Sequence, residues 1–288
     1  MRASPSLAIG LPLFLLAGLC LSSLDASAKY LVREHSLFMV VWARYLGQTL
    51  FVLPFAWRAL GPGFWRTRHL ALQLLRSLCL LVATSCFFGA LRYLPLAEGS
   101  AVTYLSPIFV VVLSGPLLGE RPGIRRWIAT FSGFIGILIL VRPGSAIFHP
   151  AAGLLLVTAL TNALFFLLTR KLVDEPPQTT LFYSALVGSV AMTAVLPWQI
   201  DFVAPVPRDA LLLLPGLFAG VGHWLVVRAF QHAQPSLLTP FMYLQMVWAT
   251  MYGYLLFGQL PDRWSAVGML IILGSGLMLA LQERARAR

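Results

Sequence analysis

Four ionisable side chains lie inside long apolar segments, and their types make them the first candidates for chemistry: Asp25, Arg44, Arg76 and His223. A charge near the centre of a bilayer costs about 3 kcal/mol on insertion scales, so it normally faces a partner or a cavity. Asp25 could pair locally with Lys29, four residues later, or with Arg44. Each arginine could instead extend its long side chain to the membrane surface, which leaves a cavity role as one of two interpretations.

His223 is the preferred candidate for carrying a coupling proton. Its imidazole titrates near neutral pH, whereas an arginine keeps its proton and a nearby cation would keep Asp25 ionised. Asp25 is the second candidate for coupling and is more simply interpreted as a structural partner. A lone buried histidine is more often a structural hydrogen-bond donor, and transport without protons is an equally open alternative.

Amide and aromatic side chains form a second group of candidates. Asn162 and Gln245 fall near the middle of their segments, where each amide needs a partner, either another helix or a substrate. Aromatic rings at mid-segment can stack on flat or apolar ligands, although packing between helices is the commoner role. The candidate lining of a substrate cavity is therefore Asn162, His223, Trp224, Tyr243, Gln245, Trp248, Tyr104, Arg44 and Arg76.

Prolines mark two positions where a spanning helix could bend. Pro107 falls inside the apolar segment 97–118, and Pro240 falls inside the segment 236–257. Proline removes a backbone donor, and a membrane helix tolerates this beside a cavity or a neighbouring helix. Because the two prolines occupy roughly matching places in the two halves of the chain, they are candidate gating elements.

Signatures of enzymes and metal sites are missing from the sequence. It contains no HExxH, no GxSxG and no GxxxxGK[ST] pattern, and Cys20, Cys79 and Cys86 lack metal-ligand spacing. We therefore expect no catalytic residues, no metal and no cofactor. Energy for any transport would come from a gradient or from the substrate itself.

The composition is that of a membrane protein. Hydrophobic residues make up 59% and charged residues 11% of the 288 residues, and the net charge is +11. A soluble domain carries roughly 25% charged residues and cannot cover so much apolar surface. The basic residues lie mainly in short segments between apolar runs, which orients membrane helices and argues against nucleic-acid binding.

Apolar runs predict an all-α integral membrane protein with ten transmembrane helices. Each run is long enough, or nearly so, for the roughly 20 residues that cross a bilayer. The predicted helices are Leu7–Tyr30, Leu37–Trp57, Leu70–Arg92, Ala97–Leu118, Arg126–Val141, Ala151–Lys171, Thr180–Trp198, Ala210–Gln231, Ser236–Phe257 and Trp264–Leu281.

Basic residues in the connecting segments predict the topology. With the N-terminus inside, 13 lysines and arginines fall on the cytoplasmic side and six on the other. The positive-inside rule therefore places both termini in the cytoplasm of a bacterial inner membrane. A cleaved signal peptide ending near Ala28 is an alternative, but its removal would leave nine helices and spoil this charge distribution.

The two halves of the chain resemble each other. Gly119 matches Gly258, Trp127 matches Trp264, and Gly136 matches Gly274, at separations of 137 to 139 residues. The sequence therefore predicts two repeats, residues 1–147 and 148–288, with five helices each. An odd number of helices inverts the second repeat relative to the first and places a substrate site between them. Chance similarity of two glycine-rich hairpins is the alternative.

Segment 92–144 and segment 240–261 resemble matching parts of the drug/metabolite transporter superfamily, in its EamA-type ten-helix branch. The resemblance extends over the whole chain in helix number and spacing, and Gln259 departs from it where the first half has Glu120. It implies two inverted five-helix repeats around a central cavity. Members export amino acids or drugs, or import vitamins and other metabolites.

Two functional hypotheses follow from the sequence. The first is a secondary transporter that moves a small organic metabolite, amino-acid-like, drug-like or vitamin-like, across the inner membrane by alternating access. Within it, a riboflavin-type vitamin importer is an alternative to an amino-acid or drug exporter. The second is an integral-membrane enzyme acting on a lipid or hydrophobic metabolite. The expected partners are the small-molecule substrate and the lipid bilayer, and a monomer is plausible.

Overall fold

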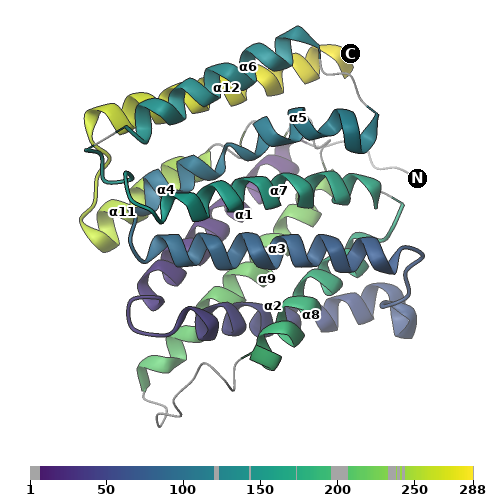
Figure 1. Cartoon of the computed structure of the whole chain (residues 1–288). Helices are drawn as coiled ribbons and strands as arrows, with labels where there is room; N and C mark the ends of the chain where they lie inside the picture. Colours follow the sequence, from purple (N-terminus) through teal and green to yellow (C-terminus); the bar gives the residue numbers. More distant parts are fainter. Residues whose placement is uncertain are drawn as a thin grey trace.

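The fold is a bundle of long helices, seen in a computed structural model (Figure 1). The structure describes residues 7–119, 123–142, 144–172, 174–195, 207–232, 238, 241 and 244–287. Every regular element within these ranges is a helix. Helices satisfy their own backbone hydrogen bonds, which a lipid environment requires.

The first half of the chain forms six α-helices. Their bounds lie within a few residues of those expected from the apolar runs, apart from one break. They are α1 Leu7–Leu31, α2 Leu37–Leu60, α3 Leu70–Leu91, α4 Leu96–Thr103, α5 Ser106–Leu118 and α6 Ile124–Leu140, with a short 3-10 helix, η1, at Gly61–Gly63.

The second half is described as five α-helices and one 3-10 helix. They are α7 Ala152–Lys171, α8 Pro177–Val195, η3 Pro207–Leu212, α9 Leu213–His232, α11 Leu244–Phe257 and α12 Arg263–Ala287. Across the described residues, six helices are long and apolar enough to cross a membrane, and shorter apolar helices accompany them. The C-terminal end of the predicted helix Thr180–Trp198, residues 196–198, and most of the first half of Ser236–Phe257 lie outside the described residues.

The predicted helix Ala97–Leu118 is broken into α4 and α5. The break falls at Tyr104 and Leu105, and Pro107 occupies the second position of α5. Proline cannot donate to the preceding turn, but the first turn of a new helix leaves that donor unused in any case. The sequence located the interruption, and the structure places Pro107 just after it.

Close packing joins helices from the two halves. α1 packs along α9, α3 along α7, α2 along both α8 and α9, and α6 along α12. Figure 1 shows α6 and α12 side by side at one edge of the bundle. Glycines allow the closest approaches: a Cβ on Gly47 would lie 2.9 Å from Gly216 Cα, and one on Gly136 would lie 2.8 Å from Gly268 O. Small residues at such crossings are typical of membrane helices.

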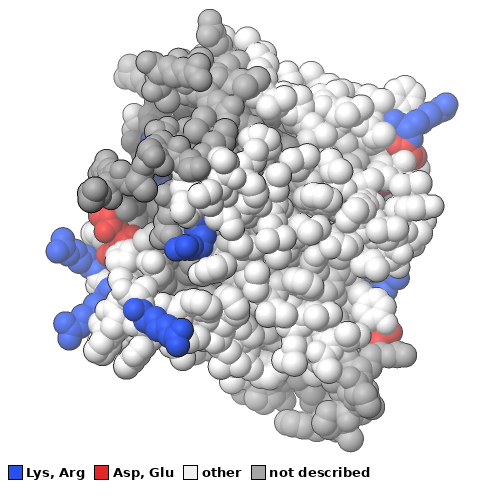
Figure 2. All heavy atoms as spheres, turned by 180° about the vertical axis from the view of Figure 1, so that it is seen from behind, with Lys and Arg blue, Asp and Glu red and all other residues white. Residues whose placement is uncertain are grey.

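A broad apolar surface surrounds the bundle. Figure 2 shows charged side chains towards two opposite edges of the molecule and a wide band of uncharged atoms between them. Large exposed side chains in the helices include Leu50, Leu74, Leu78, Ile135 and Leu270. An apolar surface of this extent needs lipid rather than water against it.

Candidate functional site

A polar layer of four side chains lies across three helices: Asp25 on α1, Arg44 and Gln48 on α2, and His223 on α9. The contacts between these helices give the height of each side chain. α1 and α9 run in opposite directions, because Phe14 packs with Ala229 while Leu21 contacts Gly222. Asp25 follows Leu21 by four residues, so it lies level with residues near 218 of α9.

α2 runs in the same direction as α9. Gly47 meets Gly216, and Phe51 meets Gly220, one turn further along both helices. Gln48 is therefore level with residues near 217, at the same height as Asp25. Gln48 and Arg44 are separated by four residues and lie on one face of α2.

Arg44 and Gln48 are buried without hydrogen-bond partners. Arg44 is 3% exposed and Gln48 is fully buried. Nε and Nη1 of Arg44 and both amide atoms of Gln48 lack a partner among the described residues. More than nine in ten buried polar groups in proteins are hydrogen-bonded, so a neighbouring pair of such residues demands an explanation.

The position of the Arg44 guanidinium is fixed by an aromatic ring. Its Cζ lies 4.1 Å from the centroid of the Tyr45 ring. Tyr45 is itself held, since its hydroxyl lies 3.2 Å from Thr84 Oγ1 and its ring fills the space that a Cβ on Gly188 would need. The guanidinium is thus oriented by a rigid support and not by a salt bridge.

Asp25 and His223 share the layer with Arg44, and the positive charge of Arg44 acts on both. Both side chains keep some accessible surface. Within the described part of the chain, the structure records no ion pair of Asp25 with Arg44 or with Lys29. Lys29 donates instead to the carbonyl oxygens of Leu91, at 3.1 Å, and Leu94.

The imidazole of His223 contacts its own helix. Nδ1 lies 2.7 Å from the Ala219 carbonyl oxygen. A carbonyl only accepts, so Nδ1 carries the proton and the neutral ring presents Nε2 as an acceptor. The contact also turns the ring back towards residue 219, which is the level of Asp25 and Gln48.

Arg76 has hydrogen-bond partners at Nε and Nη1, the two nitrogens that lack partners in Arg44. Its Nε donates to Thr169 Oγ1 at 2.6 Å, and Nη1 donates to Ser184 Oγ at 2.5 Å and to the Thr180 carbonyl at 3.3 Å. The guanidinium also lies over the Phe165 ring, 4.1 Å from its centroid. These contacts tie α3 to α7 and α8, so the geometry indicates a structural anchor.

Gln245 and Trp248 pack against α1 about two helical turns from the polar layer. A Cβ on Gly18 would lie 3.5 Å from Gln245 Cγ and 3.9 Å from Trp248. Trp248 Nε1 is buried and lacks a partner among the described residues. Gly18 precedes Asp25 by seven residues, roughly 10 Å along α1.

The remaining candidates are more scattered. Asn162 is half-buried on α7, and Tyr104 lies at the break between α4 and α5, packed against the main core. Trp224 is 36% exposed on α9, with its ring 6.0 Å from that of Phe55. Tyr243 and Pro240 lie outside the described residues.

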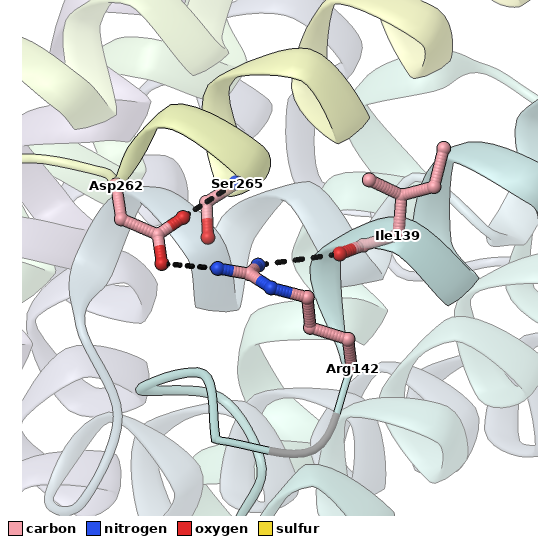
Figure 3. A network of polar contacts seen from close by, with 4 residues as sticks. All are labelled: Ile139, Arg142, Asp262 and Ser265. Atoms are coloured by element: carbon pink, nitrogen blue, oxygen red, sulfur yellow. Dashed lines mark hydrogen bonds and ion pairs between the residues drawn. The ribbon is translucent and has the colours of Figure 1, made fainter.

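One end of the bundle carries a charged network outside the spanning segments (Figure 3). Arg142, after α6, pairs with Asp262, before α12, at 2.5 Å, and also donates to the Ile139 carbonyl. The Ser265 amide donates to the Asp262 carboxylate at 2.7 Å. This amide and then Arg142 lower the pKa of Asp262 to about 2. The pair joins the end of α6 to the start of α12.

Two buried polar residues, Gln48 and Glu98, were not among the candidates predicted from the sequence. Gln48 lies one turn from Arg44 on the same face, and that spacing was the available signal. Glu98 is buried in the first turn of α4, although the sequence had left Asp25 as the sole acid inside the membrane. Over the described residues, no group of three or more His, Cys, Asp or Glu side chains is placed to hold a metal ion.

The family model of the EamA-like transporter family matches the chain twice, over residues 8–142 and 149–281. The protein belongs to the EamA-like transporter family. With its apolar helices, this makes it a multi-pass membrane protein.

Curated relatives cover nearly the whole chain. The S-adenosylmethionine uptake transporter of Rickettsia bellii is 27% identical over 96% of this chain and 94% of its own length. The riboflavin transporter of Vibrio cholerae is 28% identical over 95% and 93%. The pseudopaline exporter CntI of Pseudomonas aeruginosa is 27% identical over 69% and 71%.

The fold is also that of a solved protein. One crystal structure matches with a TM-score of 0.69 and 19% identity over 98% of this chain and 100% of that chain. At this identity the likeness concerns the fold alone. It supports the helix arrangement described above.

Proposed function

We propose that the protein moves a small organic metabolite across the bacterial inner membrane by alternating access. The family and the relatives carry this proposal, because they include proteins named for the uptake of S-adenosylmethionine, the transport of riboflavin and the export of pseudopaline. These names cover both directions of transport.

Two inverted five-helix repeats, residues 1–147 and 148–288, would provide the moving parts. In such a protein α1 corresponds to α7 and α3 to α9, so the α1–α9 and α3–α7 contacts would be one interface made twice. The α2–α8 and α6–α12 contacts would join equivalent helices. The end of α6 meets the start of α12 through Arg142 and Asp262, which is the antiparallel arrangement that inversion requires.

The polar layer of Asp25, Arg44, Gln48 and His223 would form the substrate site. The layer combines unpaired buried groups with partly accessible ones, and it lies between α1, α2 and α9. A transporter needs such groups at depth, because they replace the water that a polar substrate leaves behind. Arg76 would hold the surrounding helices in place.

His223 is our candidate for proton coupling, and Asp25 is the second. His223 Nδ1 contacts the Ala219 carbonyl, which would leave Nε2 to exchange the proton, and the charge of Arg44 acts on both His223 and Asp25. We expect a pH gradient to drive accumulation in vesicles containing the wild type and not in those containing His223→Ala. Accumulation that survives in the variant would exclude His223, and wild-type flux indifferent to the gradient would exclude proton coupling.

Flux into sealed vesicles that contain only this protein tests the function. S-adenosylmethionine and riboflavin are the first substrates to assay, with empty vesicles as the control. Substrate that crosses chemically unchanged supports transport. Conversion of the substrate without net flux would reject transport in favour of a membrane enzyme.

A further inference from the structure

The unpaired groups of Arg44 and Gln48 specify what kind of ligand fits between them. A buried guanidinium without an anion is unstable, and its fork of N–H groups binds a carboxylate through two parallel hydrogen bonds. Within the described residues, no carboxylate lies within 4 Å of Arg44. No described side chain therefore neutralises this guanidinium, and the Tyr45 ring supports it in a position where it could bind an anion.

Gln48 narrows the class of ligand further. Both atoms of its buried amide are unpaired, so Nε2 needs an acceptor and Oε1 needs a donor. A simple anion would satisfy Nε2 alone. A zwitterion satisfies both, because its carboxylate accepts from Nε2 and its ammonium group donates to Oε1.

Asp25 supplies the complementary charge across the layer. It lies at the height of Gln48 on the opposite helix and has no ion-pair partner recorded among the described residues. A polyanion would be repelled by this carboxylate, and among the buried side chains that the structure describes, Arg44 alone offers guanidinium nitrogens without a partner. An α-amino acid, with one carboxylate and one adjacent ammonium, matches the three side chains.

We propose that Arg44 and Gln48 bind the carboxylate of an α-amino-acid substrate whose ammonium group lies between Gln48 Oε1 and Asp25. This assignment rests on the proposed transport function and defines its substrate class. Arg44, Gln48 and Asp25 would each gain a partner from such a substrate, and the described residues supply none to the Arg44 Nε and Nη1 or to the Gln48 amide.

Matched ligand pairs test the assignment on the purified full-length protein in nanodiscs. S-adenosylmethionine is compared with its decarboxylated form, and L-tryptophan with tryptamine, by calorimetric or radioligand binding. We expect the wild type to bind at least one acid about tenfold or more tightly than its decarboxylated partner, since hydrogen bonds to charged groups are strong. Absence of any such preference would overturn the assignment.

Arg44→Gln should remove this preference while leaving the affinity for the decarboxylated partner within about threefold. Gln48→Leu should weaken both members of a pair, because its Oε1 contact to the ammonium is lost as well. Arg58→Gln is the matched control, an exposed arginine in the last turn of the same helix. A preference that persists in Arg44→Gln would overturn the assignment.

Melting temperatures and riboflavin transport distinguish a failure of folding or of the transport function from a failure of this assignment. Because Arg44 makes no protein hydrogen bond at Nε or Nη1, Arg44→Gln should melt no lower than the wild type, and Arg44→Lys provides a second variant that keeps the charge. Riboflavin has no carboxylate, so wild type that transports riboflavin but binds neither acid would reject this assignment and keep the proposed function. Loss of all flux would reject the function itself.

Discussion

Two arginines lie inside the helix bundle, and their surroundings give them different roles. Arg76 is satisfied by Thr169, Thr180 and Ser184 and by the face of an aromatic ring, so its charge is already used by the fold. Arg44 has a rigid aromatic support but no acceptor at two of its nitrogens. Burial alone therefore does not distinguish the two arginines, whereas their hydrogen bonds do.

Removal of the Arg76 side chain should destabilise the protein. Hydrogen bonds to a charged group contribute about 1.5–3 kcal/mol, and Thr169 and Ser184 would lose their partner in Arg76→Gln. The expected result is a lower melting temperature in detergent, with weakened affinity only as a consequence. Arg44→Gln is the comparison. Equal melting temperatures for Arg76→Gln and the wild type would contradict the anchor role.

The Asp262 carboxylate should contribute stability that depends on pH only in acid. Its pKa falls from 3.8 in the unfolded chain to about 2 in the folded protein, because the Ser265 amide and Arg142 favour the charged form. The contribution is therefore fully present above about pH 4 and is lost as the pH falls towards 2. The melting temperature of Asp262→Asn relative to wild type measures it. We expect the same small deficit at about pH 7 and pH 5, shrinking below about pH 3.

At the scale of helices, glycines decide which surfaces meet. α2 crosses α9 at Gly47 and Gly216, and α6 crosses α12 at Gly136 and Gly268, with backbone against backbone in each case. Close approach of this kind replaces hydrophobic association, which lipid does not supply. The crossing of α2 and α9 sets the height of Gln48, and the contact of α1 with α9 sets that of Asp25, so helix packing determines the polar layer.

Alanine in place of Gly268 should show whether the close approach of α6 and α12 limits which residues fit there. A Cβ on Gly268 would lie 2.6 Å from Gly136 O, so Gly268→Ala should cost about 1–3 kcal/mol through overpacking. Gly274→Ala is the control on the same helix, because its Cβ would meet nothing within 4 Å. Thermal unfolding in detergent measures both. A Gly268→Ala protein as stable as Gly274→Ala would show that the helices do not cross there.

At the scale of the whole molecule, the most extensive contacts between the described helices join the first half of the chain to the second. α1 with α9, α3 with α7, α2 with α8 and α6 with α12 all follow this pattern. Under the proposed inverted repeat, replacing each helix by its counterpart in the other half turns the α1–α9 pair into the α3–α7 pair. The α2–α8 and α6–α12 pairs stay the same. Under the proposed mechanism, rocking of one half against the other would alter the environment of Asp25, Arg44 and His223 together.

Cysteine labelling should reveal the orientation of the bundle. With both termini cytoplasmic, a single cysteine in the segment 144–148 should react with an impermeant reagent from outside, and one in 61–66 should not, because 13 of the basic residues lie on the inner side. The background must lack Cys20, Cys79 and Cys86. The opposite pattern would reverse the topology.

The sequence by itself determined the membrane class and most helix positions, because apolar run length is a local pattern. Its resemblance to EamA-type transporters gave the family, which the family model confirms. The sequence also located the break before Pro107. It singled out Arg44 and Arg76 equally, since each is an arginine in an apolar run. Only the tertiary structure distinguished them, because the acceptors of Arg76 come from helices more than 90 residues away in the chain. The same holds for Gln48, whose unpaired amide acquires meaning from the register of α1 and α2 on α9, and register depends on side-chain and glycine packing that no single segment specifies.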